Sequence, residues 1–133
     1  MIKIIPISES THWDKVIPDF PNSDVYYHRG YVEGFQLHGD GEPMLILYES
    51  DTCRGLCVMM KRDVADDEHF KDLIPHGKYY DVVTPYGYGG FIFDRTPGPE
   101  DMARINDELW GRLASEGVVA AFFRFHPVLA NAS

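Results

Sequence analysis

Residues 84–90 read Thr-Pro-Tyr-Gly-Tyr-Gly-Gly and separate two apolar, strand-like runs at 79–83 and 91–93. Three glycines within four positions allow backbone conformations with positive φ and a close approach by a ligand. These glycines are Gly87, Gly89 and Gly90. Tyr86 and Tyr88 add aromatic faces for stacking and hydroxyl groups for hydrogen bonds. The stretch therefore predicts either a ligand-facing loop or a tight turn whose tyrosines cover the core.

The segments on both sides of this stretch predict a mixed α/β (α+β) sheet. The expected strands cover residues 2–6, 43–48, 53–60, 79–83 and 118–125. A short helix is expected through Trp13, a second one ends at Gly39, and a long one runs from Pro99 to Gly117. The order β-α-α-β-β-β-α-β favours a mostly antiparallel sheet with helices on its faces. The last strand is apolar on both sides, which is typical of a central position.

Composition and charge narrow the classes of protein. The 133 residues are 44% apolar and 14% aromatic, which predicts one globular domain. The formal net charge is −9, which argues against a broad DNA-binding surface because phosphate binding requires clustered Lys and Arg. No apolar run reaches the ~18 residues of a membrane span, and no signal peptide is recognisable. The sequence thus predicts a soluble, cytoplasmic protein without membrane insertion.

Two groups of residues raise the question of a metal or redox site. Cys53 and Cys57 would share one face of a strand, and C-x-x-C spacing is absent, so reduced, buried thiols are expected. The second group comprises Asp63, Asp66, Asp67, Glu68 and His69. Its spacing fits an acidic, solvated helix start better than a set of metal ligands, so no metal site is predicted.

Near the C-terminus, Arg124 and His126 are candidate functional residues. Arg124 lies in an apolar segment, where a buried charge requires a partner. That partner is either an anionic group of a substrate or an acid such as Asp81. His126 precedes a proline and suits either acid–base chemistry or a hydrogen-bonded structural role. No arrangement of Ser, His and Asp or of Cys and His fits a catalytic nucleophile, and no catalytic residue is assigned.

Three separated segments resemble a known family. Residues 24–27 (DVYY), 80–90 (YDVVTPYGYGG) and 123–127 (FRFHP) are similar to motifs in the first half of FemAB-like proteins. These proteins are peptidoglycan-bridge aminoacyltransferases and their bacterial relatives, built from two repeats of the GNAT acyltransferase fold. The resemblance spans nearly the whole chain and implies a single GNAT-like domain over residues 1–133.

The resemblance also implies a function and partners. The chain would supply a surface for a small-molecule or peptide acceptor, such as a peptidoglycan precursor. The expected substrate-binding residues are Tyr27, Tyr86, Gly87, Tyr88, Gly89, Gly90 and Arg124. In the complete family enzyme the acyl donor would be acetyl-CoA or aminoacyl-tRNA, bound partly by a second GNAT-like half that this chain does not include. That half, or a second copy in a homodimer, is the expected partner.

Two alternatives stay open. One is a non-enzymatic interaction domain that dimerises. The other is a self-sufficient, acetyl-CoA-dependent N-acetyltransferase. GNAT enzymes hold the pyrophosphate with a Gln/Arg-x-x-Gly-x-Gly/Ala loop that opens directly into a helix. Here Thr84 occupies the Gln/Arg position and the helix begins only near Pro99, so the acetyl-CoA alternative is disfavoured.

Overall fold

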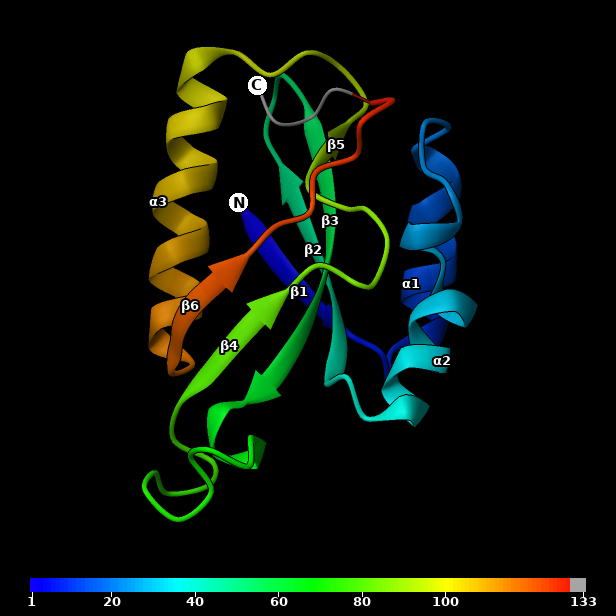
Figure 1. Cartoon of the computed structure of the whole chain (residues 1–133). Coiled ribbons are helices and arrows are strands. Elements are labelled where there is room, and N and C mark those ends of the chain that lie inside the picture. The colour runs from blue at the N-terminus through cyan, green and yellow to red at the C-terminus, as the bar shows by residue number, and fades with distance from the viewer. Residues whose placement is uncertain (130–133) are drawn as a thin grey trace.

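A six-stranded sheet forms the centre of the computed structural model, which describes residues 1–129 (Figure 1). The strands are β1 (Ile2–Pro6), β2 (Glu42–Glu49), β3 (Arg54–Asp63), β4 (Tyr80–Val83), β5 (Ile92–Phe93) and β6 (Val118–Phe122). Their spatial order is β1-β2-β3-β4-β6, and β5 also pairs with β3. Among the named strands of residues 1–129, β4 and β6 form the one parallel pair, so the predicted mixed, mostly antiparallel sheet is confirmed.

Helices cover both faces of the sheet. The helices α1 (Ser10–Val16) and α2 (Arg29–His38) lie on one face, and α3 (Pro99–Ser115) lies on the other (Figure 1). Three short 3₁₀ helices complete the described structure: η1 (Ile17–Asp19), η2 (Val25–Tyr27) and η3 (Val64–Asp66). The predicted order of elements is confirmed, with β5 as an addition. None of the helices in residues 1–129 has the length and apolarity that crossing a bilayer requires.

The two central strands divide the core into two apolar clusters. In β2, Leu45 and Leu47 pack with Trp13 of α1, whereas Ile46 packs with Leu109 of α3. Every residue from 43 to 48 is buried, as expected for a strand that is covered on both faces. The nearly continuous apolar run in the sequence therefore predicted this strand correctly.

The last strand lies at the edge of the sheet, so the prediction of a central strand over 118–125 is wrong. β6 ends at Phe122 and pairs with β4 alone among the described strands. Val119 is 63% exposed and Phe122 is 57% exposed. A strand with apolar side chains on both faces is usually buried on both faces. In β6 some of these apolar side chains are instead exposed at the edge of the sheet.

A buried carboxylate fastens α3 to the turn between β2 and β3. Asp101, in the first turn of α3, is 4% exposed. Its oxygens accept hydrogen bonds from Tyr48 Oη (2.9 Å), Ser50 Oγ (2.7 Å) and Thr52 Oγ1 (2.6 Å). The backbone N–H of Gly98 donates a fourth bond at 3.3 Å. The three hydroxyl donors, Thr52 first, hold the pKa of the Asp101 carboxyl far below its usual range.

We expect Asp101→Asn to lower the thermal unfolding midpoint at pH 7, because an amide cannot accept this set of hydrogen bonds. A carboxyl whose pKa is lower in the folded than in the unfolded chain stabilises the fold above the unfolded pKa of about 3.9. That contribution declines as the pH falls. The difference between wild type and variant, measured by circular dichroism, should therefore shrink below about pH 4. Glu100→Gln in the same helical turn is the control, and equal losses in both variants would contradict the role of Asp101.

Candidate functional site

The strands β4 and β5 are two ends of one interrupted strand. Both pair antiparallel with β3, with Val83 opposite Met60 and Ile92 opposite Leu56. Three residues of β3 thus face the eight residues 84–91, which we call the tyrosine loop. The extra residues cannot stay in the ladder, so the loop leaves the sheet toward the face that carries α1 and α2 (Figure 1).

The tyrosine loop is closed at its base by a buried threonine. The Thr84 side chain is fully buried, and its Oγ1 accepts a hydrogen bond from the backbone N–H of Arg124 at 2.9 Å. The N–H of Thr84 donates to the carbonyl of Phe122 at 3.0 Å, and the N–H of Gly89 donates to the carbonyl of Arg124 at 2.6 Å. A Cβ on Gly89 would lie 2.8 Å from Thr84 Cγ2. Thr84 and Gly89 are therefore held by the end of β6 and by the segment that follows it.

The predicted glycines and Tyr27 shape the loop from beneath. Gly87 has φ +99°, and a Cβ on it would overlap the ring of Tyr26. Gly90 has φ +94°, and its carbonyl accepts a hydrogen bond from Tyr27 Oη at 3.1 Å. Tyr27 itself is fully buried. Its hydroxyl therefore positions the loop and does not face solvent, which corrects the expectation that Tyr27 contacts a substrate directly.

Aromatic rings from three parts of the chain meet around the loop and form what we call the aromatic surface. Its members are Tyr26, Tyr31, Phe35, Tyr86, Tyr88 and His126. Tyr86 is 71% exposed and lies 6.0 Å from the Phe35 ring, centroid to centroid. Tyr88 is 43% exposed and lies 5.9 Å from the Tyr26 ring. The hydroxyl of Tyr31 donates to the carbonyl of Tyr86 at 2.6 Å and ties the loop to α2.

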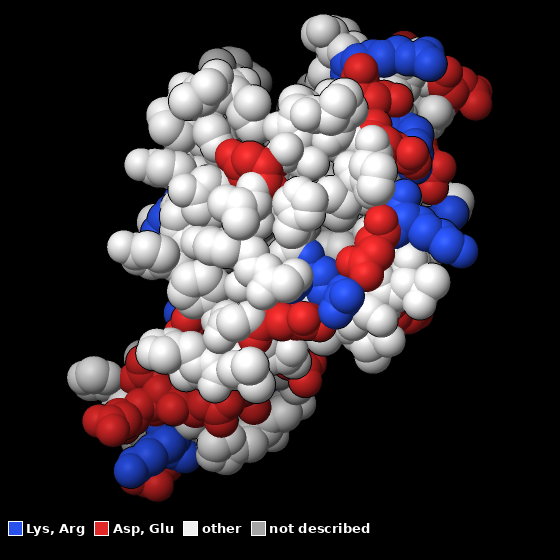
Figure 2. All heavy atoms as spheres, turned by 90° about the vertical axis from the view of Figure 1, so that its right-hand side faces the viewer, with Lys and Arg blue, Asp and Glu red and all other residues white. Residues whose placement is uncertain are grey.

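Charge is distributed unevenly on this side of the molecule. Figure 2 shows a broad area of uncharged side chains in the upper left of the view, interrupted by one acidic group. Acidic side chains gather at the lower end of the same view. The structure thus brings Tyr86, Tyr88 and the three predicted glycines together in one surface loop. Residues from η2 and α2 complete it, and the sequence alone did not assign Tyr31 or Phe35 to the site.

His126 joins the C-terminal segment to the start of η2. Its Nε2 lies 2.5 Å from Asp24 Oδ2, and its Nδ1 accepts hydrogen bonds from the backbone N–H groups of Val128 (3.2 Å) and Leu129 (3.4 Å). Since Nδ1 accepts, the proton belongs on Nε2, which donates to Asp24. Asp24 also accepts from the N–H of Tyr26 at 3.1 Å and so caps η2. Of the two roles considered for His126, the geometry favours the hydrogen-bonded structural one.

Arg124 is exposed, so the expectation of a buried, paired charge is wrong. Its guanidinium lies over the ring of Phe122 at 5.2 Å, and Nη1 donates to the carbonyl of Thr84 at 3.4 Å. Asp81 pairs instead with Arg62, through bonds of 2.7 Å and 2.6 Å. Because β6 ends before Arg124, this side chain follows the edge of the sheet and never enters the core.

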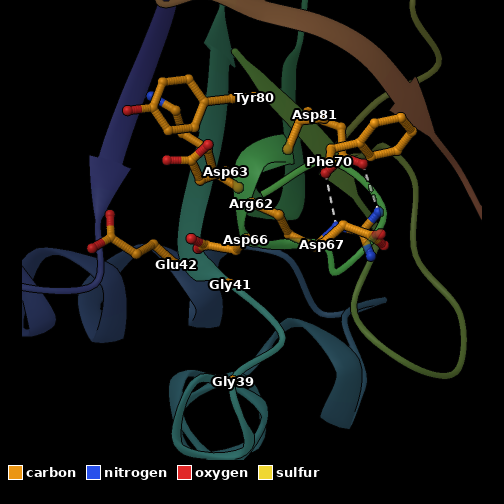
Figure 3. A pocket seen from close by; sticks show the side chains of 12 residues that line it. Gly39, Gly41, Glu42, Arg62, Asp63, Asp66, Asp67, Phe70, Tyr80 and Asp81 are labelled. Atoms are coloured by element: carbon orange, nitrogen blue, oxygen red, sulfur yellow. Dashed lines mark hydrogen bonds and ion pairs between the residues drawn. The ribbon is translucent and has the colours of Figure 1, made fainter. Parts of the chain in front are cut away.

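A hollow of about 540 Å³ lies between the end of α2, the end of β3 and η3 (Figure 3). Its lining carries five acids and two cations: Glu42, Asp63, Asp66, Asp67, Asp81, Lys61 and Arg62. The Arg62–Asp81 pair crosses it, as the dashed lines in Figure 3 show. The predicted acidic helix start is therefore the short 3₁₀ helix η3 at the rim of this hollow.

One trio beside this hollow has the donor set of a metal site. Single donor atoms of Asp63, Asp66 and His76 all lie within 4.8 Å of one another. Asp63, however, already accepts bonds from the N–H groups of Gly77 (2.7 Å) and Ala65 (3.0 Å), which hold the pKa of its carboxyl below the usual value. These two hydrogen bonds give Asp63 a structural role, since they close the loop that follows β3. His69, the histidine considered from the sequence, bonds to Asp67 instead.

The two cysteines are buried and form no disulfide. Burial raises the pKa of the Cys57 thiol to about 12, which keeps it protonated at neutral pH. The prediction that both thiols are buried is confirmed.

Gly87→Ala should destabilise the chain by about 1–3 kcal/mol, because the new methyl group meets Tyr26 at a backbone conformation that L-residues rarely adopt. Gly111→Ala provides the matched comparison, since a Cβ there meets nothing within 4 Å in the middle of α3. We expect it to stabilise by about 0.5–1 kcal/mol. Urea denaturation measures both changes. Equal stability of Gly87→Ala and wild type would show that the loop does not need glycine there.

Comparison of the chain with protein-family models, with curated proteins and with solved structures finds no match in any of the three sets. The likeness to FemAB-like proteins thus rests on the three sequence segments alone.

Proposed function

We propose that this chain is the acceptor-binding part of a FemAB-like acyltransferase, with the aromatic surface as its acceptor site. The observation that supports the proposal best is the interrupted strand. It places Tyr86 and Tyr88 in a loop outside the sheet, and the two ends of that loop are fixed by the pairing of β4 and β5 with β3. A rigid loop on a sheet scaffold is the usual way to position binding side chains. The segments that carry the family resemblance, residues 24–27, 80–90 and 123–127, are also the ones that build this loop and its supports.

The chemistry of the surface suits an amine-bearing acceptor. Aromatic faces attract ammonium groups, and the Asp24 carboxylate lies beside them with its side chain 38% exposed. The formal charge of −9 favours a cationic partner over an anionic one. A peptide of a peptidoglycan precursor, whose side-chain amine accepts the acyl group, meets these requirements.

In this proposal the chain contributes positioning and no covalent step. The acceptor amine attacks the acyl carbonyl of the donor directly; the C–N bond forms as the thioester or ester bond breaks, and the coenzyme A thiol or the tRNA hydroxyl leaves with the proton that the amine loses. The rate therefore depends on holding the two substrates together. His126 supports the surface through its bonds to Asp24 and to the backbone after it. The acyl donor, acetyl-CoA or aminoacyl-tRNA, would be held mainly by a second GNAT-like half.

The structure weakens the alternative of a self-sufficient acetyltransferase. A pyrophosphate site of the GNAT type needs free N–H groups at a helix N-terminus. Here the Asp101 carboxylate already occupies the first turn of α3 and bonds to the N–H of Gly98. In addition, β5 and residues 94–98 separate the tyrosine loop from α3.

Replacing Tyr86 and Tyr88 together by Ala should weaken binding of a lysine-containing peptidoglycan stem peptide by about tenfold, through loss of two exposed ring faces. The fold should persist because neither side chain is buried. Amide NMR titration measures the affinity, and far-ultraviolet circular dichroism checks the fold. Tyr79→Ala, an exposed tyrosine beside β4, is the control. Unchanged affinity in the double variant would overturn the assignment. Saturable acetyl-CoA shifts at residues 87–90 would instead favour the self-sufficient enzyme.

Within residues 1–129 no strand pairs with the outer edge of β6, and this edge favours a second candidate function, a dimerising interaction domain. The strand reads Val-Val-Ala-Ala-Phe and carries none of the charges that usually protect an edge. Two copies related by a twofold axis could pair these edges antiparallel without opposing like charges, despite the net charge of each chain.

For this candidate, Val119→Lys should convert a dimer into a monomer, because a charge at the edge blocks strand pairing. Analytical ultracentrifugation over a range of protein concentrations measures whether each variant is a monomer or a dimer. Leu37→Lys, at a 90% exposed position on α2, is the control and should leave association unchanged. Wild-type protein that is monomeric at all concentrations would remove the candidate.

A further inference from the structure

An apolar groove of about 750 Å³ lies away from the aromatic surface, beside α3. It is bordered by β5, by the turn that leads into α3, by one side of α3 and by the segment after β6. Its volume falls within the range of small-molecule sites, about 300–1,000 Å³. The acceptor proposal does not use this groove.

Two pairs of stacked phenylalanine rings line the groove. Phe91 and Phe93 lie 5.9 Å apart with an interplanar angle of 19°, and Phe123 and Phe125 lie 5.8 Å apart at 9°. On the α3 side, Trp110 is 43% exposed, so its indole is available for contact. Flat rings on two sides favour an aromatic or extended aliphatic group between them.

The described lining contains one cation and one acid, together with the neutral polar residues Asn22, Thr96 and Asn106. One oxygen of Asp94 accepts a hydrogen bond from the backbone N–H of Arg54 at 2.7 Å, so this carboxylate serves the turn after β5. Arg95 forms no hydrogen bond or ion pair with any residue in 1–129, and it is the only Lys or Arg among the described lining residues. The groove thus combines apolar walls with one guanidinium that has its donors available.

We propose that this groove binds a small carboxylate with an aryl or alkyl body, whose apolar part lies among the phenylalanine rings and whose carboxylate pairs with Arg95. The guanidinium presents paired N–H donors that match the two oxygens of a carboxylate. The inference is distinct from the acyltransferase proposal, since no residue of the aromatic surface lines the groove and Arg95 belongs neither to the tyrosine loop nor to its supports.

The positive charge of Arg95 favours a carboxylate over three other occupants: an amine, a second copy of the chain and a neutral apolar compound. An amine would meet Arg95 as a like charge. A second copy of the chain would bring many acids and few cations, yet the groove offers it only one guanidinium. A neutral apolar compound would gain the ring contacts and lose the ion pair.

The test compares three probes of equal length: 4-phenylbutyrate, 4-phenylbutan-1-ol and 4-phenylbutylamine. Amide NMR titration of the full chain should show saturable shifts in residues 91–96 and 102–110 with the carboxylate. We expect the carboxylate to bind about fivefold more tightly than the alcohol, as for one solvent-exposed, charge-assisted contact, and the amine to bind most weakly. Arg95→Gln should remove the preference for the carboxylate and leave the affinity for the alcohol unchanged. Arg104→Gln, an exposed arginine of α3 outside the groove, should change neither.

Three results would overturn the proposal. The first is the absence of saturable shifts in the groove at millimolar carboxylate. The second is equal affinity for the acid and the amine, or a preference for the acid that survives in Arg95→Gln. The third is a set of groove shifts that depends on protein concentration without any probe, because that would assign the groove to a second copy of the chain.

Discussion

The pairing of β3 with two separate stretches of chain is the constraint on which the rest of the structure depends. The strand holds β2 along one edge and both β4 and β5 along the other. Its alternating side chains also divide the core, since Leu56, Val58 and Met60 face α1 and α2 while Cys57 and Met59 face α3. With Val83 and Ile92 both fixed in register, the residues between them have no place in the sheet. The tyrosine loop follows from that mismatch in length.

Much of this architecture could be predicted from local patterns. The run from Pro43 to Tyr48 indicated a doubly covered strand, and all six of its residues are buried. The spacing of the apolar residues in 102–113 indicated a helix with one buried face. Three of the four residues on that face are buried, Ile105, Leu109 and Leu113, whereas Met102 is 45% exposed. Such patterns report burial on a single element. They do not indicate which element lies beside it in the fold. The apolar run of β6 therefore predicted a central position, whereas the strand lies at the edge of the sheet.

The candidate site shows the same limit. The sequence singled out the glycines and tyrosines of residues 84–90 because their chemistry is local. The supporting contacts join residues far apart in the chain: His126 reaches Asp24 across 102 positions, and Tyr31 reaches the Tyr86 carbonyl across 55. His76 comes beside Asp63 only because the loop after β3 folds back. Arg124 looked buried because the strand was expected to continue through it.

Gly55 gives the interrupted strand a further property. A Cβ at this position would lie 2.7 Å from the ring of Phe93, so the ring packs directly on the glycine backbone and fixes β5 against β3. Phe91, directly before β5, adds to this contact, since its Cδ1 would lie 3.3 Å from the same Cβ. A side chain at position 55 would push β5 away from β3, so this one missing Cβ decides whether the chain can rejoin the sheet after the loop.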